Sequence, residues 1–186
     1  MLRLLLSCVL FLFAATEATA QESVYERNGI PGEMSESRFV LTAARGPIEL
    51  HTGPDLRTPE RSIPYQAGWR IPFGETLVRT LDAIEASTIS AGTVDVLCER
   101  PDPRQMKLAQ GEPWTYLQQR GEGRGTARIQ GQVCEVPIFN REDIFGTTLR
   151  RPVVQWWVQL LYADGTSPGW LLVTREAVTF RFLRCC

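Results

Sequence analysis

The chain has 186 residues, a formal net charge of −1 at pH 7 and 44% hydrophobic residues. This length suits one domain with insertions, because a domain typically takes about 100–200 residues. The near-zero charge excludes a global electrostatic attraction to nucleic acid or to an acidic membrane surface, so we expect no nucleic-acid partner.

Residues 1–20 have the pattern of a secretory signal peptide. A short basic start with Arg3 precedes an apolar run, Leu4 to Ala15, and Ala18-Thr-Ala20 forms a small-residue cleavage site. The run is too short for a transmembrane helix, which needs about 20 residues. A lipoprotein signal at Cys8 is the alternative. We predict a periplasmic or secreted protein without stable membrane insertion.

Residues 21–37 are polar and contain Gly29, Pro31 and Gly32, which predicts a flexible N-terminal segment. A domain is expected over 38–186. Its first half contains four short runs typical of strands, separated by loops rich in glycine and proline. These runs are 38–42, 47–51, 69–72 and 75–81.

The middle of the chain is also rich in strand signals. Residues 84–90 suit either a short helix or a strand, whereas 92–99 alternates like a strand. A loop is expected over 101–112, because prolines and a glycine punctuate it. The glycine cluster 121–125 separates two alternating runs, 114–118 and 126–136, which indicates a hairpin.

The end of the chain, from Trp156 to Phe180, reads as a strand, a tight turn, a second strand, a short break and a third strand. Residues 138–152 before it are irregular. No segment has an apolar stripe at helical spacing over three turns. With 15 glycines and 12 prolines among many short strands, the fold class is all-β, a barrel or a sandwich.

Export favours disulfides, because the compartment is oxidising. The mature chain has Cys98, Cys134, Cys185 and Cys186. A bridge between the adjacent pair would force a strained ring. Cys98 and Cys134 lie in strand-like runs that bracket an insertion, so we predict that they pair. In the competing arrangement, each bonds to one of the C-terminal cysteines. No metal site is expected, because no CxxC occurs.

Several motifs resemble the bacterial SH3-like domain family. The closing half of that domain is similar to Trp157–Leu161, the turn Asp164–Gly165 and the strand Gly169–Val173. The opening half is similar to Gly46–Asp55 and Ile71–Leu81. The resemblance implies a small β-barrel that binds rather than catalyses.

The distance between these two halves departs from the family pattern. A bacterial SH3-like module is usually about half this length, whereas here residues 92–152 intervene. We therefore expect a small SH3-like barrel with a long β-rich insertion at about 92–152; two small joined barrels are the alternative.

The sequence favours a non-catalytic protein without a cofactor. His51 is the only histidine, and a base at this position would need a nucleophile or a metal within reach. No G-x-S-x-G or H-E-x-x-H motif occurs. We interpret His51 as a surface or loop residue that forms hydrogen bonds.

Aromatic side chains are the candidate binding residues, because an exposed ring offers contact area and a polar group. Alternation along Val153–Tyr162 places Trp156 in the core and Trp157 on the wet face, beside Gln155 and Gln159. In the alternative, Trp157 is covered by the insertion. The residues that we expect to contact a ligand are Trp157, Trp170, Tyr65, Trp69 and Trp114.

The resulting hypothesis is a binding module of the periplasm or cell envelope. By resemblance, its partner is a peptidoglycan peptide or an envelope protein, which docks as an extended segment against an aromatic-lined groove. The alternative is an inhibitor or accessory factor of a cell-wall-degrading enzyme. Such a factor would use the insertion, in particular residues 101–111.

Overall fold

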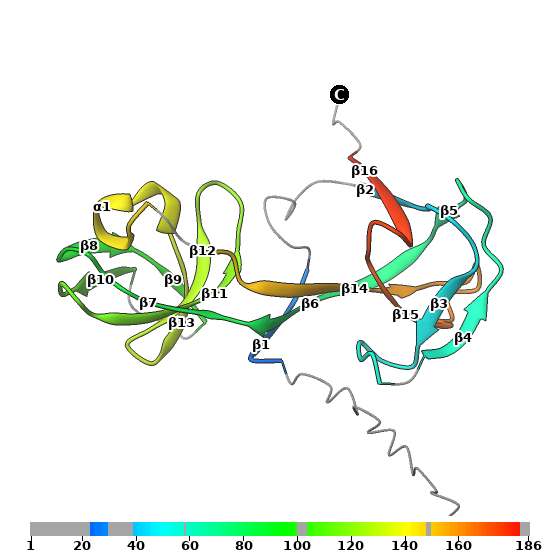
Figure 1. Ribbon diagram of the computed structural model, residues 1–186, viewed down its shortest axis with the longest axis horizontal. Coiled ribbons are helices and arrows are strands. Elements are labelled where there is room, and N and C mark those ends of the chain that lie inside the picture. The colour runs from blue at the N-terminus through cyan, green and yellow to red at the C-terminus, as the bar shows by residue number, and fades with distance from the viewer. Residues whose placement is uncertain (1–22, 30–38, 58, 100–103, 148–149, 183–186) are drawn as a thin grey trace, which may run out of the picture.

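The computed structural model describes residues 23–29, 39–57, 59–99, 104–147 and 150–182 (Figure 1). The expected signal peptide, Cys185 and Cys186 lie outside these residues. The described chain forms sixteen strands, one 3-10 helix and one four-residue α-helix. The prediction of an all-β protein is therefore confirmed. Within this part of the chain, no helix has both the length and the apolar character to cross a membrane.

One group of strands comes from the two ends of the described chain, and we call it the first unit. Its larger sheet has the order β1-β6-β14-β15-β3-β4, and its smaller sheet has the order β16-β2-β5. The strands are β1 (Tyr25–Asn28), β2 (Phe39–Ala43), β3 (Ile48–His51), β4 (Pro59–Ile63), β5 (Arg70–Ile71), β6 (Phe73–Asp82), β14 (Val153–Leu160), β15 (Gly169–Leu172) and β16 (Val178–Phe182).

The remaining elements lie between β6 and β14 in the sequence, and we call them the second unit. Its sheets have the orders β7-β11-β12-β13-β9 and β10-β8. The elements are β7 (Ile84–Ser87), β8 (Gly92–Asp95), β9 (Leu97–Cys98), β10 (Gln105–Leu108), β11 (Pro113–Gln119), β12 (Gly125–Ile129), β13 (Gln132–Val136), η1 (Ile138–Asn140) and α1 (Glu142–Phe145).

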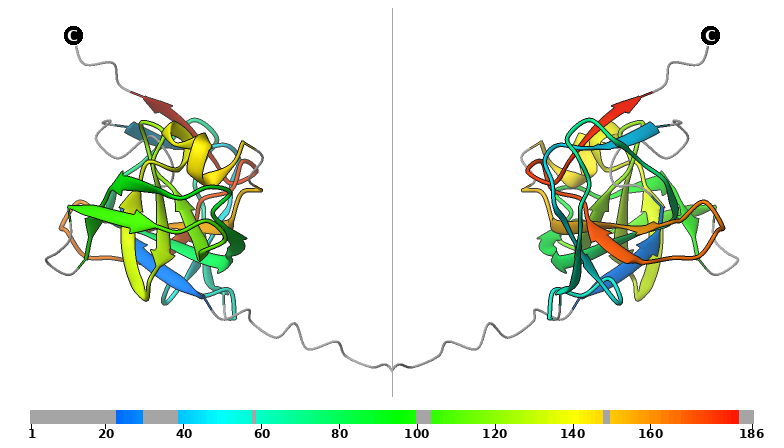
Figure 2. Two further views of the ribbon diagram at one scale, coloured as in Figure 1. Left: turned by 90° about the vertical axis from the view of Figure 1, so that its left-hand side faces the viewer. Right: turned by 90° about the vertical axis from the view of Figure 1, so that its right-hand side faces the viewer.

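The two units have separate hydrophobic cores. The first core gathers buried side chains such as Leu41, Leu50 and Trp156. The second gathers Trp114, Tyr116 and other buried residues. Figure 1 shows the two units at opposite ends of the molecule, with β6 and β14 running between them, and Figure 2 views the molecule from each of these ends. Because the described ladders leave every sheet open, neither unit forms a closed barrel within these residues.

Several sequence predictions need correction. The segment 21–37 was expected to be flexible, but Tyr25–Asn28 forms β1, which pairs with β6. The expected loop 101–112 contains β10, which pairs with β8. The ambiguous run 84–90 begins with strand β7, which pairs with β11. Long-range pairing stabilises these strands, and a local pattern does not show it.

The predicted hairpin around 121–125 is confirmed, because β11 and β12 pair across it. The run 126–136, however, is two strands and not one. Gln130 and Gly131 both adopt positive φ angles, 51° and 74°, between β12 and β13. Two successive residues of this kind form the tight turn that suits the twist of a two-residue hairpin.

Buried polar contacts connect the two units. The Thr80 hydroxyl on β6 donates to the Leu117 carbonyl on β11 at 3.0 Å. The side-chain amide of Gln118 donates to the Val78 carbonyl at 3.3 Å, and Arg27 Nε donates to Gln118 Oε1 at 3.3 Å. Because Thr80, Leu117 and Gln118 are buried, these bonds hold the second unit against β1 and β6.

Tyr116 should make the second core sensitive to alkali. Its ring is fully buried, its hydroxyl has no hydrogen-bond partner among the described residues, and burial raises its pKa to about 12. An unfolded tyrosine ionises near pH 10, so the stabilising contribution is complete below about pH 10 and is lost as the pH rises toward 12. We expect wild type to lose about 2–3 kcal/mol more than Tyr116→Phe over this interval.

Urea unfolding of both proteins at pH 8 and at about pH 11 should reveal half of this difference, about 1.4 kcal/mol, because pH 11 lies midway between the two pKa values. At pH 8 the two should agree within about 1 kcal/mol, because phenylalanine removes only a buried hydroxyl. Parallel loss of stability in both proteins at high pH would contradict the prediction.

Candidate functional site

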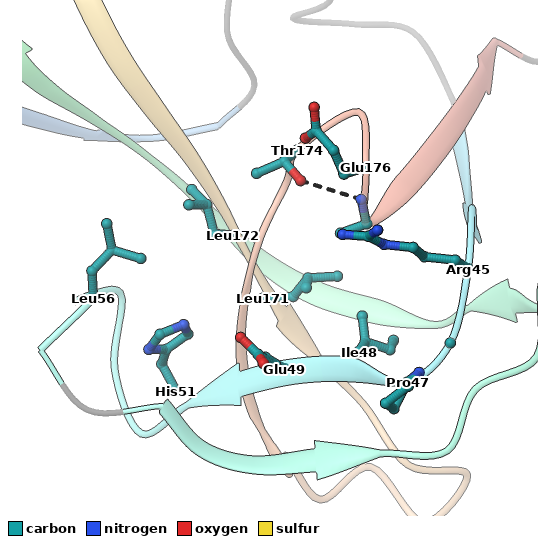
Figure 3. Close-up of a pocket in the computed structure, with 12 residues that line it drawn as sticks. Arg45, Pro47, Ile48, Glu49, His51, Leu56, Leu171, Leu172, Thr174 and Glu176 are labelled. Carbon is teal, nitrogen blue, oxygen red and sulfur yellow. Dashed lines mark hydrogen bonds between the residues drawn. The ribbon is translucent and has the colours of Figure 1, made fainter.

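A groove opens in the first unit where β3 and β15 diverge. The ladder between these strands joins only His51 and Trp170. Beyond this pair β15 follows β14, with Leu172 opposite Trp157, while β3 follows β4. The divergence leaves a groove of about 450 Å³ (Figure 3).

The groove has apolar walls and a charged rim. Its apolar side chains include Ile48 and Leu171, which are buried in the first core, and Leu56, which is half exposed. Figure 3 shows His51 and Leu56 at one end, and Arg45 and Glu176 at the other. The full lining is Arg45, Gly46, Pro47, Ile48, Glu49, His51, Leu56, Leu171, Leu172, Thr174, Glu176 and Ala177.

The backbone of β15 also faces the groove. The Val173 N–H donates to the Trp156 carbonyl on β14 at 2.8 Å. Because successive residues of a strand direct their N–H groups to opposite sides, the Leu172 N–H points away from β14 and toward β3. The groove therefore combines a strand edge with apolar side chains.

Charges of both signs surround the groove. Arg45 and Glu49 are exposed side chains of its lining. The pKa of Glu176 lies below its usual value, because its own backbone N–H and the Thr174 hydroxyl donate to the carboxylate and because Arg45 is close. Glu176 is consequently ionised at neutral pH, and the rim carries two acids and one base.

His51 does not lie on the surface as predicted. His51 is only 7% exposed, and its ring stands edge-on to the Trp157 ring with a centroid distance of 5.2 Å. The Nδ1 atom is buried without a hydrogen-bond partner among the described residues. His51 therefore closes one end of the groove by packing. In the described part of the chain, no group of three or more His, Cys, Asp or Glu residues is placed to hold a metal ion.

Trp157 was predicted on the wet face, and this interpretation is wrong. It is fully buried, and its indole N–H donates to Gln155 Oε1 at 3.2 Å. The loop after His51 folds toward this face of the sheet, where Arg79 donates to the Pro54 carbonyl. Leu77 on β6 pairs with Trp157, and Arg79 lies two residues after Leu77. The Arg79 side chain is therefore on the same face of the sheet as Trp157. The neighbouring prediction is confirmed, because Trp156 is buried in the first core.

Trp114 is the second predicted binding residue that is buried. It is 2% exposed and packs edge-on against Phe145, with a centroid distance of 5.0 Å. Its ring therefore lacks the exposed area that the predicted contact with a ligand requires. Its indole contributes to the second core.

Tyr65 and Trp69 form an aromatic pair, in which Tyr65 is partly buried against the first core and Trp69 is exposed. Their ring centroids are 6.2 Å apart, and Trp69 is 51% exposed. The Trp69 carbonyl accepts from the Ala43 N–H, and the Gly68 N–H donates to the Ala43 carbonyl. These two bonds hold the turn at Gly68 and Trp69 against Ala43, which lies two residues before Arg45 of the groove lining. The Tyr65 carbonyl also packs closely against Gly46 of the groove lining. The pair thus adjoins one end of the groove.

Trp170 is half-buried and lies opposite His51, where the groove begins. Three of the five predicted residues, Tyr65, Trp69 and Trp170, therefore lie beside the groove. The sequence did not indicate the lining residues Glu49 and Leu172. Only the divergence of β3 and β15 places them in a groove, and no local pattern shows that divergence.

The predicted disulfide is confirmed. Cys98 on β9 and Cys134 on β13 are bonded and lie opposite each other in the ladder between these strands. They belong to the second unit and take no part in the groove.

Comparison with known proteins finds no matching family model, curated protein or solved structure. The resemblance to bacterial SH3-like domains rests on the sequence motifs alone and stays a prediction.

Proposed function

We propose that the protein is a non-catalytic binding module of the periplasm or cell envelope, and that the groove between β3 and β15 holds an extended segment of a peptidoglycan peptide or an envelope protein. The single-pair ladder between these strands carries the proposal. An extended peptide binds such an edge through main-chain hydrogen bonds, and side-chain pockets add specificity. The leader-like residues 1–20 and the disulfide support an exported location.

The lining of the groove suits a short peptide with both apolar and charged side chains. Leu56 and the partly exposed Leu172 offer apolar contacts, whereas Arg45 and Glu49 offer charges of opposite sign at the rim. The aromatic pair Tyr65–Trp69 beside Gly46 extends this surface. Aromatic rings of this kind supply contact area at a low cost in conformational entropy.

A pull-down from envelope extract and from purified peptidoglycan, followed by mass spectrometry, identifies the ligand. The double variant Arg45→Ala with Glu49→Ala should then raise the Kd for that ligand by about tenfold or more, because both rim charges are lost. Both side chains are exposed, so folding should be unaffected.

The matched control is Glu75→Ala with Arg128→Ala, which removes one acid and one base from exposed positions outside the groove. It should bind like wild type. Equal binding by the groove variant and wild type would refute the groove as the site. If wild type and the groove variant both recovered a wall-degrading enzyme, the inhibitor hypothesis would be favoured, with the second unit as the binding surface. Leu97, which is 70% exposed there, is the side chain to change next.

A further inference from the structure

Arg79 connects the groove to the N-terminal strand, although it does not line the groove itself. Its side chain extends from β6 and is only 16% exposed. Nε donates to Glu26 Oε1 on β1 at 2.7 Å, and Nη2 donates to the Ser23 hydroxyl just before β1 at 3.4 Å. Nη1 donates to the Pro54 carbonyl in the loop after His51. All three guanidinium nitrogens therefore have partners, and these partners come from two separate segments.

The loop of residues 52–57 forms one end of the groove. Leu56 belongs to this loop, lines the groove and is half exposed (Figure 3). The N–H groups of Asp55 and Arg57 both donate to acceptors within the loop itself. Among the described residues, Arg79 is the one side chain outside the loop that forms a hydrogen bond with it. The position of Leu56 therefore depends on Arg79.

Strand β1 in turn holds the Arg79 side chain. It is an edge strand, and Glu26 lies directly opposite Arg79 in the ladder with β6. The Ser23 hydroxyl donates to Glu26 Oε1 at 2.6 Å, so these two residues present neighbouring acceptors to Arg79. The donors of a planar guanidinium have fixed directions, and the bonds of Nε and Nη2 to these acceptors therefore fix the direction of Nη1. The position of β1 thus determines how Arg79 meets the Pro54 carbonyl.

We propose that Arg79 is a positioning residue of the groove, and that strand β1 controls the Leu56 wall through it. With β1 in place, the guanidinium holds the loop and Leu56 keeps its position. With β1 displaced, Arg79 loses two of its three partners, and the loop is released. Linkage requires the reverse effect as well, so a ligand that contacts Leu56 stabilises the pairing of β1 with β6. The effect on a ligand rests on the proposed function, whereas the effect on the loop does not.

NMR spectroscopy of the full chain tests the coupling without a ligand. The Leu56 methyl signals report on the loop, and hydrogen exchange of the buried Trp157 indole N–H reports on its opening. Arg79→Gln should shift the methyl signals and accelerate this exchange by at least about tenfold, because a charge-assisted hydrogen bond is lost. Glu26→Gln should change both signals in the same direction, with exchange about threefold faster, although Glu26 does not line the groove.

Arg79→Lys separates the positioning role from a general loss of stability. Lysine keeps the charge that pairs with Glu26, but a single ammonium group does not reproduce the directed donors of the guanidinium. Backbone exchange of Tyr25–Asn28 should therefore stay as in wild type, while the Leu56 signals move as in Arg79→Gln. This variant and Glu26→Gln also decide the matter if Arg79→Gln does not fold.

The matched control is Glu75→Gln, which removes an acid from another exposed position of β6 and should leave both signals unchanged. Wild-type Leu56 and Trp157 signals in both Arg79 variants would overturn the positioning role. Wild-type signals in Glu26→Gln would overturn the control by β1.

Muropeptides released from purified peptidoglycan test the reverse effect. Muropeptides that shift the Leu56 methyl signals of wild type should also slow the backbone exchange of Tyr25–Asn28, and Arg79→Lys should abolish this slowing. Binding at Leu56 with unchanged exchange in β1 would overturn the coupling. Failure of muropeptides to bind any of these proteins would count against a peptidoglycan ligand in the proposed function, and the variant signals alone would then decide the coupling between β1 and the loop.

Discussion

Replacing Trp157 with alanine should lower the free energy of unfolding by about 3–5 kcal/mol. Trp157 is fully buried, and its ring contacts His51 edge-on. Its N–H is already bonded to Gln155 within the protein, so the side chain has no exposed donor to offer to a ligand. Truncation leaves a large cavity between the sheet and the loop after His51. Urea denaturation measures the loss as a lower midpoint with an unchanged slope.

The control for this experiment is Trp69→Ala. Trp69 is the same residue type but is 51% exposed, so its removal should cost about 1–2 kcal/mol, clearly less than the loss expected for Trp157→Ala. If Trp157→Ala kept full stability and lost only ligand binding, Trp157 would have the surface role that the sequence pattern predicted.

Alternation along β14 shows which side chains share a face, but it does not show what covers that face. It correctly placed Trp156 in the core. It failed for Trp157 because the loop after His51 covers this residue, and that loop lies about a hundred residues earlier in the chain. Arg79 holds the loop there by donating to the Pro54 carbonyl. Trp157 is therefore covered on a face where its neighbours Gln155 and Gln159 stay partly exposed.

The second unit illustrates the same limit. Met106 and Leu108 are buried while Gln105 and Lys107 are exposed, so β10 does alternate as a strand should. Prolines and a glycine around it concealed this short signal. Its partner β8 lies ten residues or more away in the sequence. The pairing of Cys98 with Cys134, in contrast, was predictable because both cysteines lie in recognisable strands.

The groove was the least predictable feature. It arises because β3 and β15 separate after one residue pair, and this separation depends on how β15 follows β14 and β3 follows β4. The opening motif Gly46-Pro47 and the Gly169-Trp170 motif drew attention to both strands. Neither motif indicates that their edges diverge, because local sequence does not encode the register between distant strands.

Removing the disulfide with Cys98→Ala and Cys134→Ala should destabilise the second unit by about 4 kcal/mol. The bridge joins residues 36 positions apart, and in the chain-entropy model its loss gives the unfolded chain more freedom. It also ties β9, a strand of only two residues, to the edge of the five-stranded sheet. Hydrogen exchange with peptide-level mass spectrometry shows where protection is lost.

Loss of protection should be concentrated in β9, β12 and β13, whereas β3 and β15 should stay protected, because the two units have separate cores. The single variant Cys98→Ala is the control; it breaks the same bond and should give nearly the same loss. Wild-type protection of β9 in the double variant would show that strand pairing alone holds this edge. Equal loss in both units would show that the bonds from Thr80 to Leu117 and from Gln118 to Val78 couple them into one cooperative structure.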